Sequence, residues 1–248
     1  MAGDLVSLRI LTVAAELPNR ELWQEAVGNA SIPIELEMME VAPAAALLAR
    51  GGADICVLDA ELSEAHKGIL VKAARTVQTP PLIFITGPKD SPRVDGVDGI
   101  LAKPANQDEA RKLIQLCVRA MIPTRVLVVD DSGTMRSIVR KILTASHFAL
   151  DIHEASEGNA ALERLRAEKF GIVFLDYNMP GLTGFETLAE IKRESPQVAV
   201  VMMTSTLDNA IADRAHAAGA LAFLKKPFYP ADIDATLERY YGLHTVGG

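Results

Sequence analysis

Cysteine is scarce in this sequence, and its two cysteines lie in apolar surroundings. Cys56 and Cys117 each stand within a run of aliphatic residues. A small fold stapled by disulfides needs a dense set of cysteines, which this chain lacks. Cysteines in apolar runs are typical of small buried side chains in a reducing compartment. We therefore expect an intracellular protein that is held together by a hydrophobic core.

Long hydrophobic runs and an excess of positive charge are also absent. No apolar stretch approaches the ~20 residues of a membrane-spanning helix, and charges as early as Asp4 and Arg9 leave no core for a signal peptide. Lys and Arg number 25 against 32 Asp and Glu, a formal net charge of -7. Such a surface does not attract nucleic acid or anionic lipid. These absences predict a cytoplasmic protein that binds neither nucleic acid nor membranes.

The chain does have the length and the apolar content for two compact domains. It contains 248 residues, of which 49% are hydrophobic, and this excludes a disordered or collagen-like chain. At ~100–200 residues per domain, there is room for one large or two small domains. Pro123 and Thr124 lie at the midpoint. We predict a division into residues 1–122 and 123–248.

The second half alternates between short apolar runs and segments of helical periodicity. The apolar runs show no polar alternation, as is typical of parallel strands covered on both faces. Between them, apolar residues recur three and four positions apart, as from Met135 to Leu143, which predicts amphipathic helices. This order predicts a parallel sheet between helices, with functional groups at the C-terminal strand ends. The expected strands are 126–129, 150–154, 172–175, 198–203 and 222–224.

The first half repeats this order more faintly. Asp59 and Thr86 correspond to Asp176 and Thr204 at spacings that differ by one residue, and an apolar stripe from Leu113 to Met121 predicts a closing helix. The sequence therefore predicts one α/β fold written twice, as tandem flavodoxin-like, doubly wound sheets of five parallel strands. The strands expected in the first copy are 8–13, 34–41, 55–58, 82–85 and 99–101.

Two differences separate the copies. The stretch between Thr86 and Lys103 is shorter than its counterpart in the second copy and is rich in glycine and proline. Because these residues break helices, we expect a shortened or missing fourth helix in the first copy. The second difference is chemical, since Ala14 and Ala15 stand where the second copy has Asp130-Asp131.

The strand ends of the second half collect polar groups of complementary chemistry. Asp130, Asp131, Asp176, Thr204 and Lys226 each follow a predicted strand, and in a parallel sheet they converge on one crevice. Carboxylates in such a cluster repel one another unless a cation joins them, and oxygen ligands favour Mg²⁺. With Lys226 as a second positive charge, the group suits phosphoryl transfer. An alternative is that Asp130-Asp131 only caps a helix and Asp176 only forms a turn.

The second half resembles the receiver domain of two-component response regulators, most closely the chemotaxis type. The resemblance covers residues 124 to 242 and rests on four strings that occur in the family's order and spacing. They are Val-Asp130-Asp131-Ser-Gly-Thr-Met-Arg-Ser-Ile-Val-Arg, Leu-Asp176-Tyr-Asn-Met-Pro180-Gly-Leu-Thr-Gly184, Met-Thr204-Ser and Phe223-Leu-Lys-Lys226-Pro227-Phe.

The resemblance implies a role for each matching residue. Asp176 is the expected phosphoacceptor, which takes a phosphoryl group from a histidine kinase or a histidine phosphotransfer protein. Asp130, Asp131, Asp176 and the backbone carbonyl of Asn178 are the implied Mg²⁺ ligands, and Lys226 is expected to pair with a phosphoryl oxygen.

The resemblance also implies a conformational switch and residues that set the lifetime of the phosphorylated state. Thr204 would move toward the phosphoryl group and vacate space for Phe223, which is the expected switch residue, although an aromatic in such a strand can also be plain core. Asn178 and Thr206 flank the route of the attacking water and would set the lifetime of the phosphorylated state.

The first half resembles a degenerate receiver over residues 8 to 121. Asp59, Thr86 and Lys103 survive there, but Ala14 and Ala15 cannot bind a cation. We expect Asp59 not to be phosphorylated efficiently and to form an ion pair with Lys103 instead. Our hypothesis is that this copy docks on, or helps to dimerise, the second copy as a homodimer and tunes its switch.

The output is expected to pass through contacts with a downstream protein, because only a short tail without a DNA-binding or enzymatic segment follows Tyr241. The expected surface is the face of the fourth helix, fifth strand and fifth helix, around 208–218, 222–225 and 230–241. Two alternatives remain at this stage. One is a Mg²⁺-dependent phosphohydrolase with an aspartate nucleophile, although Asp176-Tyr-Asn178 lacks its second acid; the other is a scaffold in which neither site reacts.

Overall fold

The chain folds into two compact units. The computed structural model describes residues 7–14, 20–28, 30, 32–88, 94–146, 148–205 and 209–243. Of these, the residues up to Ala120 and those from Tyr241 onward form the N-terminal unit, and Met121–Tyr240 form the C-terminal unit. Among the described residues, no helix is both long and apolar enough to cross a bilayer.

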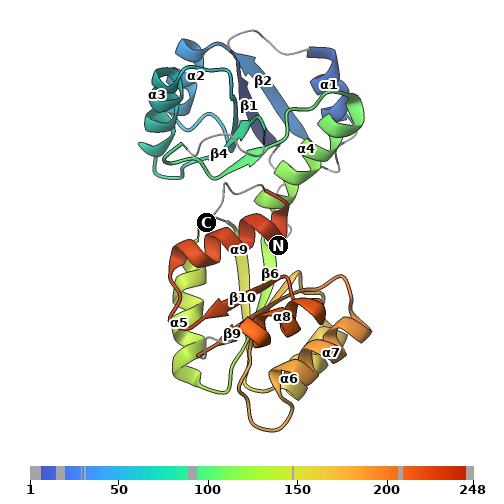
Figure 1. Cartoon of the computed structure of the whole chain (residues 1–248). Coiled ribbons are helices and arrows are strands. Elements are labelled where there is room, and N and C mark those ends of the chain that lie inside the picture. The colour runs from blue at the N-terminus through green and yellow to red at the C-terminus, as the bar shows by residue number, and fades with distance from the viewer. Residues whose placement is uncertain are drawn as a thin grey trace. The chain divides into compact units, whose positions relative to one another are not determined.

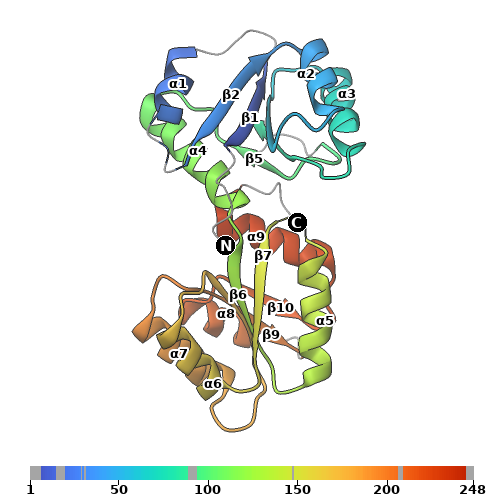
Figure 2. The same cartoon turned by 180° about the vertical axis from the view of Figure 1, so that it is seen from behind.

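The N-terminal unit is a parallel sheet of five strands in the order β2-β1-β3-β4-β5. Helices α2 and α3 cover one face of the sheet, and α1 and α4 cover the other (Figures 1 and 2). In chain order its elements are β1 (Leu8–Val13), α1 (Arg20–Gly28), β2 (Ile34–Met39), α2 (Val41–Leu48), β3 (Ile55–Asp59), α3 (Glu64–Arg75), β4 (Leu82–Thr86), β5 (Gly99–Leu101) and α4 (Gln107–Met121).

The C-terminal unit repeats this topology, with five parallel strands in the order β7-β6-β8-β9-β10. Helices α6, α7 and α8 lie on one face, and α5 and α9 lie on the other (Figure 2). The tandem flavodoxin-like sheets predicted from the sequence are therefore confirmed. The elements are β6 (Thr124–Val129), α5 (Gly133–Thr144), β7 (Leu150–Ala155), α6 (Gly158–Ala167), β8 (Ile172–Asp176), α7 (Gly184–Glu194), β9 (Ala199–Thr204), α8 (Asn209–Ala217), β10 (Ala222–Lys225) and α9 (Pro230–Tyr241).

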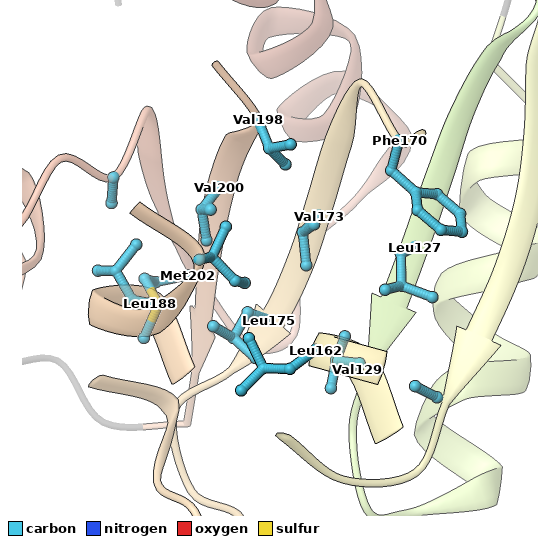
Figure 3. Close-up of a cluster of buried hydrophobic side chains, with 14 of the residues drawn as sticks. Leu127, Val129, Leu162, Phe170, Val173, Leu175, Leu188, Val198, Val200 and Met202 are labelled. Atoms are coloured by element: carbon cyan, nitrogen blue, oxygen red, sulfur yellow. The ribbon is translucent and has the colours of Figure 1, made fainter. Parts of the chain in front are cut away.

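Uninterrupted apolar sequence explains the central strands. Every residue of β3 and of β8 is buried, because helices cover both faces of each strand. The edge strand β2 instead alternates, and its Glu35 and Glu37 are exposed or partly exposed. Figure 3 shows how Val173 and Leu175 of β8 pack with side chains of β6 and β9 and with Leu162 and Leu188 of the covering helices. This core fixes the positions of the strand ends that carry the polar groups.

Side-chain caps set where two helices begin near those strand ends. The hydroxyl of Ser132 accepts a hydrogen bond from the backbone N–H of Met135 at the start of α5. Thr183 and Glu186 form a reciprocal capping box at the start of α7. The caps thus fix the ends of the loops that follow Asp131 and Asp176.

One predicted strand boundary is wrong. The strand expected over 34–41 ends at Met39, and Val41 opens α2 instead. Pro43 lies in the first turn of this helix, where a missing N–H breaks no helical hydrogen bond. Val41 is as apolar as a strand residue, so hydrophobicity alone does not reveal that the strand ends before it.

The described residues between β4 and β5 contain no helix, as predicted from their glycines and prolines. Instead, Arg75 of α3 donates hydrogen bonds to the carbonyl oxygen of Gly96 and to the carboxylate of Asp98, at 2.8 and 2.7 Å. The buried Asp98 carboxylate also accepts the backbone N–H of Ile83, at 2.7 Å. An ion pair with backbone contacts therefore anchors the segment that stands where the C-terminal unit has α8.

Candidate functional site

The polar groups predicted from the sequence meet at the C-terminal edge of the sheet in the C-terminal unit. Val129 pairs with Leu175, and Thr204 pairs with Lys225, so β6, β8, β9 and β10 end at nearly the same level. Asp130 directly follows β6, while Asp176 and Thr204 are the last residues of β8 and β9. Parallel strand registry alone therefore gathers side chains that are far apart in the sequence.

Lys226 joins two of the aspartates. Its ammonium nitrogen lies 2.6 Å from Oδ2 of Asp130 and 2.7 Å from Oδ1 of Asp176. The backbone N–H of Lys226 also donates to the carbonyl oxygen of Thr204, which fixes the residue against β9. The two carboxylates are buried, with relative exposures of 1% for Asp130 and 5% for Asp176. The lysine thus lies in a nearly closed, charged cluster.

A third carboxylate completes an acidic cluster. Oxygen atoms of Asp130, Asp131 and Asp176 all lie within 4.8 Å of one another, and Asp131 is exposed to solvent. One lysine cannot neutralise three carboxylates, so the cluster keeps a net negative charge. Oxygen ligands of this kind suit Mg²⁺, and the exposed Asp131 leaves a side open to solvent. The residues present therefore fit a divalent cation.

Burial and mutual repulsion shape the ionisation of this cluster. Burial raises the pKa of Asp176, and the charges of Asp130 and Asp131 add to this increase, while Lys226 opposes it. Burial by itself would lower the pKa of Lys226, but its hydrogen bonds to the two buried aspartates outweigh this and raise it. The site thus stabilises the charged form of Lys226. It destabilises the ionised form of Asp176 relative to its protonated form.

The remaining predicted residues surround the cluster at different depths. The Thr204 side chain is fully buried, whereas Phe223 is only partly buried and packs against the core cluster that contains Met202. Asn178 is exposed, in the loop that follows β8. Thr206 lies outside the described residues. Among the described residues, the structure thus brings the carboxylates of Asp130, Asp131 and Asp176 together with the ammonium group of Lys226, and the carbonyl oxygen of Thr204 binds the backbone of Lys226.

Two residues that support the acidic cluster were not predicted from the sequence. Arg136 of α5 donates a hydrogen bond to the carbonyl oxygen of Asp130, at 2.8 Å, and contacts Glu154 at 3.1 Å, so it holds the acidic loop. Gly184 lies so close to the chain at Asp176 and Tyr177 that an added Cβ would collide with the carbonyl oxygen of Asp176. Arg136 and Gly184 both lie within the quoted strings and could have been singled out there.

The equivalent edge of the N-terminal unit has a different arrangement. Lys103 lies 2.9 Å from Oδ2 of Asp59 and 3.1 Å from Oε1 of Glu61. Hydrogen bonds to Asp59, and then to Glu61, raise the pKa of Lys103. Ala14 is buried at the end of β1, and Thr86 is buried at the end of β4. Among the described residues, this edge forms no cluster of three metal-ligating side chains.

Comparison with known proteins places the C-terminal unit among its relatives. Residues 126–238 match the family model described as "Response regulator receiver domain". The chain is 31% identical over 115 residues to "Chemotaxis protein CheY" of Thermotoga maritima, a match that covers 46% of this chain and 95% of that protein. It is 31% identical over 116 residues to "Response regulator UvrY" of Escherichia coli O6:H1, and this match covers 47% of this chain and only 53% of that protein.

A solved structure is similar over both units. The chain described as "Structure of probable two-component system response regulator/GGDEF domain protein" aligns with a TM-score of 0.54 over 95% of this chain and 98% of that chain. At 22% sequence identity this likeness concerns the fold alone. It indicates that two such sheets in tandem occur in another chain as well.

Proposed function

The chain belongs to the response regulator receiver family of two-component signalling proteins, and from this premise we propose that Asp176 accepts a phosphoryl group from a phosphohistidine. The observation that carries the proposal is the position of Lys226 between the buried Asp130 and Asp176, with Asp131 in the same cluster. Positioning and charge neutralisation are what phosphoryl transfer needs from a protein. The donor in this proposal is a histidine kinase or a histidine phosphotransfer protein.

The transfer is a substitution at phosphorus. A carboxylate oxygen of Asp176 forms the new P–O bond while the P–N bond to the donor imidazole breaks. The imidazole nitrogen keeps the electron pair of that bond and takes up a proton. Lys226, already within hydrogen-bond distance of Asp176, is placed to pair with a phosphoryl oxygen of the product. We propose that this domain catalyses only its own phosphorylation and dephosphorylation.

Asp130, Asp131, Asp176 and the backbone carbonyl of Asn178 are the residues that we expect to hold Mg²⁺. The chemistry that Mg²⁺ supplies when bound is neutralisation of the carboxylates and of the oxygens of the transferring group. The buried Asp130 carboxylate also accepts the backbone N–H of Ser132, at 2.9 Å, so its orientation is set before any ligand arrives. Arg136 holds the same loop through the Asp130 carbonyl.

We propose that the signal leaves through the face built by α8, β10 and α9. Phosphorylation at Asp176 would draw the Thr204 hydroxyl toward the new charge, and the partly buried Phe223 would rotate into the space released. Tyr229 lies between β10 and α9 and is 66% exposed, which supports a protein contact at this face. The proposed partner is a downstream protein, and by analogy with the chemotaxis relative we propose that it belongs to a chemotaxis pathway. Asn178 and Thr206 are proposed to set the lifetime of the phosphorylated state.

We propose that the two copies have different roles. Residues 123–248 carry out the phosphoryl chemistry, and the N-terminal receiver copy, residues 1–122, does not. Ala14 replaces the inner acid, and Lys103 is bound by both Asp59 and Glu61. With no cation site, an incoming phosphoryl group would meet two carboxylates and one lysine. We propose that this copy tunes the other by docking or by forming a homodimer.

Intact mass spectrometry tests the proposal. The full chain is incubated with Mg²⁺ and acetyl phosphate, next to the matched variants Asp176→Asn and Asp59→Asn. We expect one labile phosphoryl group in the parent, none in Asp176→Asn and full labelling in Asp59→Asn. Loss of half the label in Asp59→Asn would show that both units react. Labelling of neither unit would favour a scaffold, and steady release of phosphate from many phosphomonoester molecules per chain would favour a phosphohydrolase.

A further inference from the structure

A cavity of about 240 Å³ lies at the C-terminal strand edge of the N-terminal unit. Trp23 of α1 and Ala14, at the end of β1, form part of its apolar wall. Asp59, Thr86 and Lys103 bring carboxylate, hydroxyl and ammonium groups to the same cavity. It is therefore an apolar chamber with a few polar groups on one side, the usual composition of a small-molecule site.

The cavity lies at the edge where the two units differ in their charged residues. In the C-terminal unit, Lys226 contacts both Asp130 and Asp176. In the N-terminal unit, Ala14 carries no carboxylate, and Lys103 turns to Asp59 and Glu61. A methyl group and a lysine bound elsewhere thus stand at this edge where the C-terminal unit has an acid and a bridging lysine.

The size and charge of the chamber define the ligand. A cavity of ~150 Å³ is enough for benzene, so this one has room for a single ring with a planar substituent. The buried indole of Trp23 offers an apolar, aromatic surface. Glu61 does not line the chamber, but it binds Lys103 from outside, so the lysine is shared between two carboxylates and does not fully neutralise Asp59.

We propose that this cavity binds a small planar aromatic molecule that carries N–H donors, neutral or singly positive. The ring lies in the apolar chamber beside Trp23, and the N–H groups donate to the carboxylate of Asp59. A carboxylate can accept more bonds than the two that Asp59 receives from Lys103 and from the backbone N–H of Glu61. This binding needs no phosphoryl group and is independent of the chemistry at Asp176.

Tryptophan fluorescence of the full chain tests the proposal, because Trp23 is the only tryptophan in the sequence. Benzamidine and benzoate are matched probes, since both are a ring with a planar group and they differ in charge and in N–H donors. We expect benzamidine to change the emission saturably, with a dissociation constant on the order of 1 mM. Benzoate should bind at least about tenfold more weakly. The absence of a saturable change, or equal binding of the two probes, would overturn the proposal.

Two filling variants and one charge variant locate the binding. Ala14→Leu fills the chamber, and Ala105→Leu enlarges an exposed residue that lines it, where folding is not at risk. Each should weaken benzamidine binding by about tenfold. Ala42→Leu, the same change at an exposed position of α2, is the control and should bind as the parent does. Asp59→Asn should remove most of the preference for benzamidine over benzoate. Unchanged binding in both filling variants would place the probe elsewhere and refute the site.

Discussion

The two units share a topology but differ in how they use the same strand edge. In the C-terminal unit a partly buried lysine bridges two buried aspartates, and a third aspartate faces solvent. In the N-terminal unit the lysine is half exposed and pairs with one buried and one exposed acid, next to an open chamber. The comparison teaches that the same sheet can carry a charged cluster or an ion pair beside a cavity at this edge, depending on the few residues that follow its strands.

The largest expected effect concerns the two equivalent lysines. Lys226→Met leaves two buried carboxylates without their partner, and we expect the free energy of unfolding of the C-terminal unit to fall by about 3 kcal/mol. Lys103→Met removes a half-exposed lysine, and we expect a loss of at most about 1 kcal/mol. Calorimetry in the presence of a chelator measures both. Equal losses would mean that the two ion pairs are buried to the same extent in solution.

A second substitution makes the strand edge of the C-terminal unit resemble that of the N-terminal unit. Asp130→Ala removes the inner acid and should lower the rate of labelling by acetyl phosphate about a hundredfold, as the loss of a preorganised charged group does in other sites. Asp108→Ala, the same change in an exposed ion pair of α4, is the matched control. Intact mass against time gives both rates. A rate for Asp130→Ala within about twofold of the control would remove the chemical basis of the comparison.

The third prediction concerns the segment that stands in place of a helix. Asp98→Ala removes a buried carboxylate that binds Arg75 and the backbone N–H of Ile83, so we expect the N-terminal unit to lose about 2 kcal/mol. Trp23 reports on this unit, and denaturant unfolding followed by its emission measures the loss. The labelling of Asp176 should not change. A change in labelling without a change in the tryptophan transition would contradict this account.

The smallest effect is a pH dependence of opposite sign in the two units. The pKa of Asp176 is raised, so its protonation stabilises the fold; this stabilisation is present below the unfolded pKa and is lost as pH rises through the raised value. Asp176→Asn should therefore be more stable than the parent at neutral pH, and the difference should vanish in acid.

Asp54 of the N-terminal unit supplies the matched opposite case. Burial raises its pKa, but the hydrogen bonds from Arg9 outweigh this and lower it. Its contribution to stability is present above the unfolded pKa and is lost as pH falls through the lowered value. Asp54→Asn should be less stable than the parent at neutral pH and converge with it in acid. Calorimetric stability measured against pH compares both variants, and the same sign for the two would contradict the electrostatic account.

Much of this molecule could be predicted because strands and strand ends leave a direct record in the sequence. The uninterrupted apolar runs of β3 and β8 marked central strands, and polar residues directly after such runs had to meet at one edge. Glycine and proline between Thr86 and Lys103 predicted the lack of a helix that the described residues of this stretch show. In each case a local sequence pattern was compatible with only one type of secondary structure.

The features that could not be predicted depend on where long side chains point and on volumes that remain unfilled. Arg136 acts through a long side chain that touches a carbonyl several residues away, and its type alone does not say where it points. The pairing of Lys103 with Glu61 could not be predicted, because the sequence does not show which carboxylates lie within reach of the lysine. The chamber beside Trp23 is a volume that no side chain of the described residues fills, and no residue type in a sequence marks a void. The early end of β2 was missed because Val41 is as apolar as a strand residue.

The contacts of Arg75 with Gly96 and Asp98 have a consequence for how the N-terminal unit deforms. They join α3 to residues 96–98, and the Asp98 carboxylate in turn accepts the backbone N–H of Ile83 in β4. We expect α3, the start of β4 and the residues that lead into β5 to move as one body. A disturbance at α3 would then reach the edge strand of the sheet directly.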